Sequence, residues 1–443
     1  MPARTWSGSS DDSHERGSGR HSDAVGERAS VRSPVPRRRD SRAPRGPDDQ
    51  DAKLTLTRHP VLLGLAIALV AANLPPALAS VGPVLDDVRI DLALTGTLAA
   101  LLVSLPVFCL GALAPAAPRL ARQWGMEPII AIVLVGIGTG LLLRALGGTG
   151  LLFAGMVIAS GAIAVANVLL PALIKRDFPA HSGAMMGIYT MALSGFAAVA
   201  AATTVPLGDL IGYGWRGALG VWAILAFLAL LLWMPFANVH TPPPIAAPTR
   251  SSLLRHALAW EVTVFFGLQS LLFYSVLSWL PSIYRDHGYS PAEAGLVLSA
   301  VTFVQIPVSL LVPRFAARAR DQRRYIILST TLTAVGLAGV LVAPTTTPYL
   351  WAMIIGVGLG GSFAIGLLLF VLRGRTASDT AQLSAMAQTF GYLLAATGPL
   401  LLGAVDDATG SWSPPLALLF VLVVPQFVAG VLAGRPLQIG RSE

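Results

Sequence analysis

The sequence has little charge. Asp, Glu, Lys and Arg make up 12% of the 443 residues, whereas 54% are hydrophobic and the mean hydropathy is +0.67. Soluble proteins contain about 25% charged and roughly 45–50% apolar residues. The shortage of charge therefore excludes an ordinary soluble domain and predicts an integral membrane protein.

Residues that could support catalysis, metal binding or nucleotide binding are scarce. The single cysteine, Cys109, cannot form a disulfide within the chain, and we interpret it as a small packing residue. The seven histidines form no metal-binding pattern with it, and there is no Walker motif. We therefore expect no metal, no cofactor and no ATP-driven mechanism. A polytopic membrane enzyme is disfavoured, because it would need catalytic groups clustered at one membrane face.

The first 53 residues have almost no large apolar side chains and are rich in Arg, Asp, Ser, Gly and Pro. Such a segment cannot bury enough apolar surface to offset the entropy lost on ordering, so we interpret residues 1–57 as a disordered cytoplasmic tail. It contains no apolar core of a secretory signal peptide. The tail holds 11 of the 31 Lys and Arg residues and short loops hold the rest, so no continuous basic face predicts a nucleic-acid partner.

Twelve apolar segments follow the tail, each close to the ~20 residues that cross a ~30 Å hydrocarbon core as a helix. They are predicted at 61–81, 95–116, 127–146, 151–173, 184–206, 217–237, 261–283, 291–312, 324–343, 347–370, 383–403 and 414–433. A proline-rich, charged stretch separates the first six from the last six. The predicted organisation is an N-terminal six-helix bundle at 58–238, a cytoplasmic linker at 239–256, a C-terminal six-helix bundle at 257–436 and a cytoplasmic tail at 437–443.

The distribution of basic residues predicts the orientation. From residue 54 onward, 16 of the 20 Lys and Arg residues fall on one set of loop ends and 4 on the other, counted along the predicted spans. Because cytoplasmic loops carry the excess of Lys and Arg, we expect both termini in the cytoplasm. The protein is then a multi-pass component of the cytoplasmic membrane, in contact with membrane lipid.

Two sequence matches indicate an internal duplication. Pro118-Arg119-Leu120-Ala121-Arg122 is echoed after the eighth predicted span by the segment from Pro313, at an offset of 195 residues (313 − 118). Trp215 aligns with Trp412 at a similar offset, 197 residues (412 − 215). Such repeats predict two pseudo-symmetric six-helix halves. Parallel repeats of this kind are typical of the major facilitator fold, whose solute site lies between the halves near the membrane midplane.

Several segments together extend this interpretation. They are SVGPVLDD from Ser80, APRLAR from Ala117, NVLLPALIKRDFP from Asn167, GIYTMAL from Gly187, WLPSIY from Trp279, ARDQRR from Ala319 and LWAMIIGVGLGGSF from Leu350. Over residues 60–435 the chain resembles the cyanate and 2-nitroimidazole transporters, a branch of the major facilitator superfamily. The resemblance implies secondary active transport of a small polar, planar or anionic, cyanate-like solute by alternating access. Efflux of 2-nitroimidazole or another drug-like compound is the alternative.

The chain departs from that family pattern in the first span. Relatives typically carry NLRP where this chain has Asn73-Leu74-Pro75-Pro76, so a cation that could pair with an anion is missing. The two prolines and the later Gly-Pro pair also interrupt an apolar helix and free backbone groups that lipid cannot satisfy. We therefore expect this stretch to lie against protein or a wet cavity.

Polar side chains inside the other spans supply the remaining candidates for solute binding, since each is costly in hydrocarbon. With Asn73, the predicted solute-binding residues are Asn167, Tyr189, Gln269, Tyr274, Gln305 and Gln388, and Tyr392 offers a further hydrogen-bonding group. Asn167 precedes Pro171 by four residues, which places an amide beside a free carbonyl. Hydrogen bonding between helices is the alternative role for all of these residues.

Charged residues at span ends are the candidates for gating or coupling: Asp86, Asp87, Arg144, Lys175 and Arg176. For Arg144 we expect a structural partner such as Asp86 or Asp87. Lys175 and Arg176 either attract an anion or anchor the helix by snorkelling. No span contains a central carboxylate, so if proton coupling drives transport, Asp86 and Asp87 are the nearest candidates.

A third functional class remains besides a transporter and a membrane enzyme. A sensor built on the same fold, without transport, would use residues 1–57 to bind a partner. Deleting residues 1–53 would then abolish its function.

The interrupted first span generates a prediction. Replacing Asn73 by Ala should impair transport and leave expression intact, because the amide lies beside the proline break where a solute pathway is expected. Uptake by purified wild-type and Asn73→Ala protein in proteoliposomes measures this. Normal uptake by the variant would contradict it.

Overall fold

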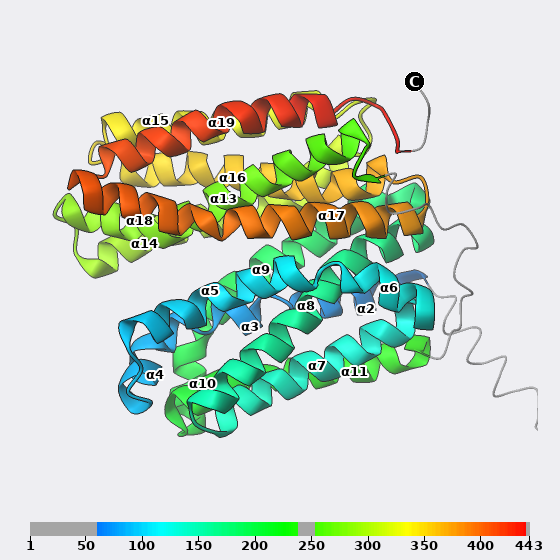
Figure 1. Cartoon of the computed structure of the whole chain (residues 1–443), viewed down its shortest axis with the longest axis horizontal. Coiled ribbons are helices and arrows are strands. Elements are labelled where there is room, and N and C mark those ends of the chain that lie inside the picture. Colours follow the sequence, from blue (N-terminus) through cyan, green and yellow to red (C-terminus); the bar gives the residue numbers. More distant parts are fainter. Residues whose placement is uncertain (1–59, 238–252, 440–443) are drawn as a thin grey trace, which may run out of the picture. The chain divides into compact units, whose positions relative to one another are not determined.

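The computed structural model describes residues 60–237 and 253–439, which belong to one compact unit within Asp48–Glu443. The predicted tail at 1–57 and residues 239–252 of the predicted linker lie outside the described residues. The described part is helical throughout (Figure 1).

Helices of the first half run from residue 60 to residue 237. They are α2 (Pro60–Ala72), α3 (Pro76–Ala79), η1 (Gly82–Val84), α4 (Leu85–Asp91), α5 (Gly96–Leu113), α6 (Ala116–Trp124), α7 (Met126–Leu146), α8 (Thr149–Asp177), η2 (Pro179–His181), α9 (Ser182–Ile211), α10 (Gly214–Gly220) and α11 (Trp222–Ala237). The second half contains α13 (Ala257–Asp286), α14 (Pro291–Ala316), α15 (Arg323–Val342), α16 (Pro348–Arg373), α17 (Ala377–Ala395), α18 (Thr397–Thr409) and α19 (Ser413–Ala433).

The number of membrane-spanning helices agrees with the sequence. Eleven helical segments of the described chain are long and apolar enough to cross a membrane, and the pair α5–α6 makes a twelfth if it is counted as one span. The two helices of that pair meet at 54°, close to the end of the span predicted at 95–116. Pro115, the N-cap residue of α6, has no N–H to continue the hydrogen-bond ladder of α5, which accounts for the bend.

The first span is broken where the sequence predicts an interruption. α2 ends at Ala72 and α3 begins at Pro76. Between them the backbone N–H of Asn73 donates to the Val70 carbonyl (3.1 Å), three residues back instead of four. The two prolines at 75 and 76 cannot donate at all, so the helix cannot pass through this point unbroken.

Pseudo-symmetry between the halves is visible in matched hydrogen bonds. The Trp215 indole N–H donates to Asp91 (3.2 Å) in the first half, and the Trp412 indole N–H donates to Asp286 in the second. The carboxylates are 195 residues apart (286 − 91) and the tryptophans 197 (412 − 215). The offsets match those of the sequence repeat, so each half ties its first span to its last span in the same way. We call this side of the protein the acidic end.

A second matched pair lies at the opposite, basic end. Arg176 at the end of α8 pairs with Glu127 at the start of α7 (2.6 Å). Arg373 at the end of α16 donates to Gln322, directly before α15. The offsets are again 197 (373 − 176) and 195 (322 − 127). The duplication thus kept the position of each contact but replaced a carboxylate by an amide in the second half.

The hydrophobic core is shared at the basic end and divided at the acidic end. One cluster of buried side chains there includes residues of both halves, such as Leu173 and Tyr189 of the first and Phe266 and Leu383 of the second. Toward the acidic end, one separate cluster belongs to the second half and another to the first. The pairs α9 with α14, α5 with α17 and α8 with α17 lie in contact across the halves (Figure 1).

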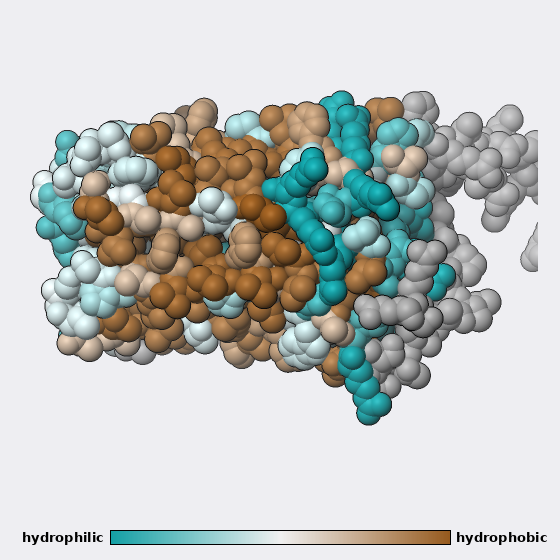
Figure 2. All heavy atoms as spheres, turned by 90° about the horizontal axis from the view of Figure 1, so that it is seen from above, coloured by the Kyte–Doolittle hydropathy of each residue, from teal (hydrophilic) through white to brown (hydrophobic). Residues whose placement is uncertain are grey.

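The outer surface carries large apolar side chains in its middle. On the face shown in Figure 2, hydrophobic residues form a band between hydrophilic ends. Exposed examples among the described residues are Leu228, Leu231, Val421 and Val424, each more than half exposed. Such a band is what the hydrocarbon core of a bilayer covers.

The contact between α9 and α14 depends on a glycine. A Cβ added at Gly187 would overlap the Leu310 carbonyl oxygen, whereas one added at Gly195 on the same helix would meet nothing within 4 Å. We expect Gly187→Ala to lower the free energy of unfolding by about 1–3 kcal/mol through overpacking. Thermal unfolding in detergent measures this. Gly195→Ala is the matched control and should be as stable as the wild type or slightly more stable, since Ala favours helix; equal losses in both variants would contradict the prediction.

Candidate functional site

A proline in α8 creates a free carbonyl at the boundary between the halves. Pro171 has no N–H to donate to the carbonyl of Asn167, four residues earlier. The Gln388 side chain on α17, from the second half, donates its Nε2–H to that carbonyl instead (3.1 Å). The second half therefore completes a hydrogen bond that the kinked helix of the first half cannot make.

The side chain of the same asparagine joins a second predicted residue. The Tyr189 hydroxyl on α9 donates to Asn167 Oδ1 (3.1 Å), and Tyr189 and Gln388 are fully buried. The structure thus brings together Asn167, Tyr189 and Gln388, which are far apart in the sequence. Ser384, one turn before Gln388, accepts its other amide N–H (2.7 Å). Sequence reasoning missed Ser384, although its four-residue spacing from Gln388 is the available signal.

Aromatic residues of the second half adjoin this group. Tyr392 lies one turn after Gln388 on α17 and packs edge-on against Phe266, with ring centroids 5.4 Å apart. Tyr274 on α13 packs edge-on against Phe273, with ring centroids 5.3 Å apart. The arrangement combines amides with tyrosine rings, so it can hydrogen-bond to and stack on a planar polar molecule.

The remaining two predicted glutamines form a different group inside the second half. Gln269 on α13 donates to the Leu359 carbonyl (3.4 Å) and accepts a hydrogen bond from Ser270 (3.2 Å). Gln305 on α14 packs against the next residue of α16, Gly360. Both glutamines are buried, and they contact neighbouring residues of α16, Leu359 and Gly360. They form no hydrogen bond with the group at Asn167 among the described residues.

Asn73 closes the break in its own helix. Its Nδ2 donates to the Leu69 carbonyl (2.7 Å), the acceptor that its backbone N–H would serve in an unbroken helix. The Asn73 Oδ1 has no hydrogen-bond partner among the described residues, and the residue is 2% exposed. Asn73 is therefore a structural cap that leaves one buried acceptor unused.

Arg144 satisfies carbonyls at two helix ends. Its guanidinium donates to the Ala77 carbonyl (2.5 Å), to the Ser80 hydroxyl (2.8 Å) and to the Leu219 carbonyl (3.2 Å). The Ala77 carbonyl is free because the Val81 N–H bonds to a different residue. Leu219 lies directly before the junction of α10 and α11. One side chain of α7 thus ties the first and sixth spans together.

The expectation that Asp87 pairs with Arg144 is corrected by these bonds. Arg144 is completely buried, whereas Asp87 is exposed and forms no ion pair with it. The side chain of Asp86 lies outside the part of the chain that the structure describes. Carbonyl dipoles and a hydroxyl take the place that we assigned to a carboxylate, because the broken helices around Arg144 offer several unpaired acceptors.

Lys175 and Arg176 lie at the basic end of α8 and differ in their surroundings. Arg176 binds Glu127 and Asp177, each at 2.6 Å, and is therefore engaged in a structural ion-pair group. Lys175 is half-buried and interacts electrostatically with Asp379 at the start of α17, across the halves. Arg176 is thus held by carboxylates of the first half, whereas Lys175 forms no ion pair with the described carboxylates.

Further hydrogen bonds join the halves close to the basic end. The Thr190 hydroxyl on α9 donates to the Ser309 carbonyl on α14 (2.6 Å), and the hydroxyls of Ser194 and Ser309 are 3.0 Å apart. Sequence reasoning missed these three residues. Hydroxyl groups inside apolar spans are the signal, but which of them face another helix depends on the packing.

Helices α9 and α17 are buried more continuously toward the basic end than toward the acidic end. Seven residues of α9 are buried between Gly183 and Ala192. Beyond Ala192 only Ala200, Thr204 and Gly208 are buried, and their four-residue spacing places them on one face of the helix. α17 is buried continuously from Thr380 to Gln388 and more sparsely afterwards. The halves are therefore packed together at the basic end and less so at the acidic end.

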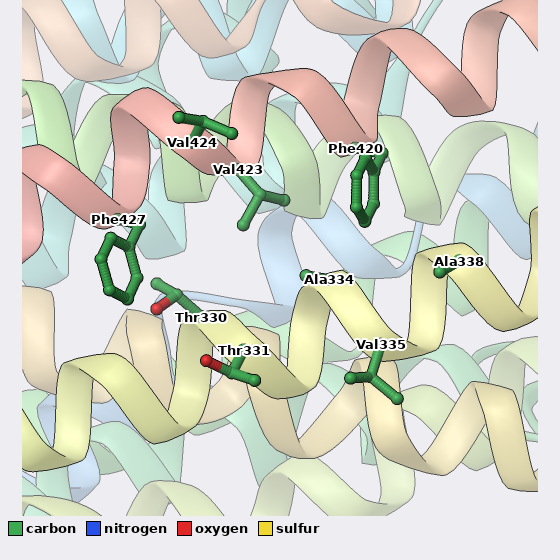
Figure 3. A pocket seen from close by; sticks show the side chains of 9 residues that line it. All are labelled: Thr330, Thr331, Ala334, Val335, Ala338, Phe420, Val423, Val424 and Phe427. Carbon is green, nitrogen blue, oxygen red and sulfur yellow. The ribbon is translucent and has the colours of Figure 1, made fainter.

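A groove of about 420 Å³ lies between α15 and α19 in the second half (Figure 3). Its lining is apolar except for two hydroxyls, and the side chains are those of Thr330, Thr331, Ala334, Val335, Ala338, Phe420, Val423, Val424 and Phe427. No residue of the first half lines it, so it is not a site between the halves. The described residues contain no group of three His, Cys, Asp or Glu side chains that could hold a metal ion.

These features define a class of protein: a multi-pass helical membrane protein whose two related six-helix halves enclose buried polar groups. The sequence matches the Major Facilitator Superfamily over residues 61–399 and 264–436. The chain therefore belongs to the Major Facilitator Superfamily, a family of transporters rather than enzymes.

Relatives with similar sequences match most of the chain. The 2-nitroimidazole transporter of Escherichia coli is 37% identical over 388 residues, which are 86% of this chain and 98% of the relative. The cyanate transport protein CynX of the same organism is 32% identical over 358 residues, 79% and 91% of the two chains. An uncharacterised transporter of Bacillus subtilis, YycB, is 39% identical over 379 residues, 85% and 94%.

Solved structures support the fold. The proton:xylose symporter XylE superimposes with a TM-score of 0.68 at 13% identity, covering 86% of this chain and 98% of its own. FucP in the outward conformation gives 0.63 at 14% identity, with 83% and 98% covered. The predicted major facilitator fold and the resemblance to the cyanate and 2-nitroimidazole transporters are both confirmed.

The role of Arg144 can be tested by replacement. Arg144→Met keeps a flexible, unbranched side chain of smaller size but leaves two buried carbonyls without donors, each at a cost of ~1–3 kcal/mol. We expect a loss of stability of about 2 kcal/mol or more, measured as thermal unfolding in detergent. Arg285→Met is the control, because Arg285 is exposed and bonds only to Ser282 on its own helix. A variant Arg144→Met as stable as this control would contradict the assignment.

Proposed function

We propose that this chain is a secondary active transporter that moves a small polar, planar or anionic, cyanate-like solute across the cytoplasmic membrane by alternating access. The family supplies the general activity, and the named substrates of two relatives supply the size and chemistry of the solute. The single observation that carries the proposal is the hydrogen-bonded group of Asn167, Tyr189 and Gln388, which is built from both halves.

Alternating access requires that the halves separate at one end while they close at the other. The shared core, the Thr190–Ser309 hydrogen bond and the Asn167–Gln388 hydrogen bond all lie toward the basic end. If both termini are cytoplasmic, as the basic residues predict, this state is closed to the cytoplasm. The interhalf hydrogen bonds would break as the protein opens to that side.

The predicted solute-binding residues have different roles in this proposal. We assign direct contact with the solute to Asn167, Tyr189, Tyr274 and Gln388, which lie in or beside the group at the boundary of the halves. Asn73 and the pair Gln269 and Gln305 are assigned to the pathway within each half.

The gating residues divide in the same way. Lys175 is the proposed gating residue, since it lies half-buried at the basic end of α8, a helix that packs against α17 of the other half. Arg144 and Arg176 hold elements of the first half in place. Proton coupling, if it operates, would involve Asp86 and Asp87 at the acidic end, and membrane lipid would fill the groove between α15 and α19.

Efflux of 2-nitroimidazole or another drug-like compound is the second candidate, and one observation favours it. The two fully or nearly buried arginines of the described spans, Arg144 and Arg373, are bound to backbone carbonyls and polar side chains. Both terminal nitrogens of Arg144, and Nε and Nη2 of Arg373, are thus engaged by the protein, and Pro75 stands in the place of a cation. A neutral planar solute needs no such partner.

A counterflow experiment tests the transport function. Proteoliposomes are preloaded with unlabelled cyanate, nitrate, 2-nitroimidazole or a small amide, and the uptake of the same compound in labelled form is measured. For at least one of these compounds, uptake should be well above that of protein-free liposomes. Adding a pH gradient should change the rate if protons are coupled. Absence of counterflow for all four classes would contradict the proposed function.

A further inference from the structure

The amide of Gln388 has one orientation that chemistry permits. The Asn167 carbonyl can only accept a hydrogen bond, so the NH2 group of Gln388 must face it, and the Ser384 hydroxyl takes its second N–H. The Oε1 atom is left without a partner among the described residues, although Gln388 is fully buried. A buried acceptor with no donor is unfavourable and marks a place for a missing group.

The surroundings of this oxygen are those of a ligand site. It belongs to a residue that bridges the two halves, and Tyr392 lies one turn away on the same helix face. The donor of Tyr189 is already used by Asn167. Gln388 Oε1 is thus a free acceptor beside an aromatic side chain, whereas the Tyr189 hydroxyl and the Asn167 side chain satisfy each other.

We propose that Gln388 Oε1 accepts a hydrogen bond from the transported solute, and that the protein selects neutral planar solutes that carry an N–H donor, such as an N–H azole or a primary amide. An anion without a donor cannot satisfy this oxygen and is repelled by its partial negative charge. This inference rests on the proposed transport function and narrows its substrate class.

A second carboxamide oxygen has the same character. Asn73 is held in one orientation by the Leu69 carbonyl, which can only accept, and its Oδ1 is also buried without a partner. The first half therefore contributes a free acceptor from the broken span, as the second half does from α17. Both favour a donor-bearing solute over an anion.

The experiment compares solutes that differ only in the donor. 2-Nitroimidazole is paired with 1-methyl-2-nitroimidazole, and acetamide with N,N-dimethylacetamide, with cyanate and nitrate as donor-free anions. Counterflow in proteoliposomes should be about tenfold or more faster for each N–H solute than for its methylated partner. Equal counterflow rates for the two members of each pair with wild-type protein would overturn the inference.

Variants separate hydrogen bonding from steric exclusion of the methyl group. Gln388→Met keeps the size of the side chain and removes the acceptor, so the preference for the N–H solute should fall to within about twofold. Gln382→Met is the matched control on α17, where the glutamine bonds to Ser378 of its own helix, and should keep the full preference. A preference that persists in Gln388→Met would be steric and would overturn the inference.

A measurement on wild-type protein covers the case in which Gln388→Met does not fold. The unfolding temperature in detergent should be raised by 2-nitroimidazole and not by 1-methyl-2-nitroimidazole. Only the solute with an N–H donor is expected to bind and so to stabilise the folded state. Equal shifts would overturn the inference. Failure of the proposed function looks different: in that case none of the solutes, with or without a donor, shows counterflow in the wild type.

Discussion

The structure depends on one constraint: a backbone group that is freed by a helix break or a proline inside the membrane has to find its partner within the protein. Three side chains meet this constraint. Arg144 serves carbonyls of the first and sixth spans, the Asn73 amide caps the end of α2, and Gln388 reaches from the second half to the carbonyl that Pro171 leaves free. The first two bonds fix the first half internally. The third crosses the boundary between the halves, so it links the stability of the closed state to the candidate site.

The same constraint explains why polar residues in the spans have unequal roles. A side chain that serves a permanent break, as Arg144 does, cannot leave it without exposing carbonyls to hydrocarbon, and it is therefore structural. A side chain whose partner is in the other half loses that partner whenever the halves separate. Gln388 and Thr190 are of this second kind. Motion and solute recognition can therefore act on the same atoms, without a charged residue at the membrane centre.

The duplication adds rigidity to each half. The tryptophan–aspartate hydrogen bonds at the acidic end and the arginine contacts at the basic end recur at offsets of 195 and 197 residues, and each connects spans within one half. Contacts between the halves are of a different type, with hydroxyls, amides and close glycine packing. Contacts repeated within each half, together with uncharged contacts between the halves, are compatible with a movement of whole halves against each other.

The sequence by itself determined the membrane class, twelve apolar spans, the duplication, the break at Asn73 and the family, because apolar runs of fixed length, prolines and repeats are local patterns. It also gave Asn167, Tyr189 and Gln388 as polar residues in apolar surroundings. Only the tertiary structure decided that these three bond to one another, that α5 and α6 are bent, and that Arg144 binds carbonyls instead of Asp87. These outcomes depend on which helix faces which, and a side chain's partner across a helix interface follows from packing that no local pattern encodes.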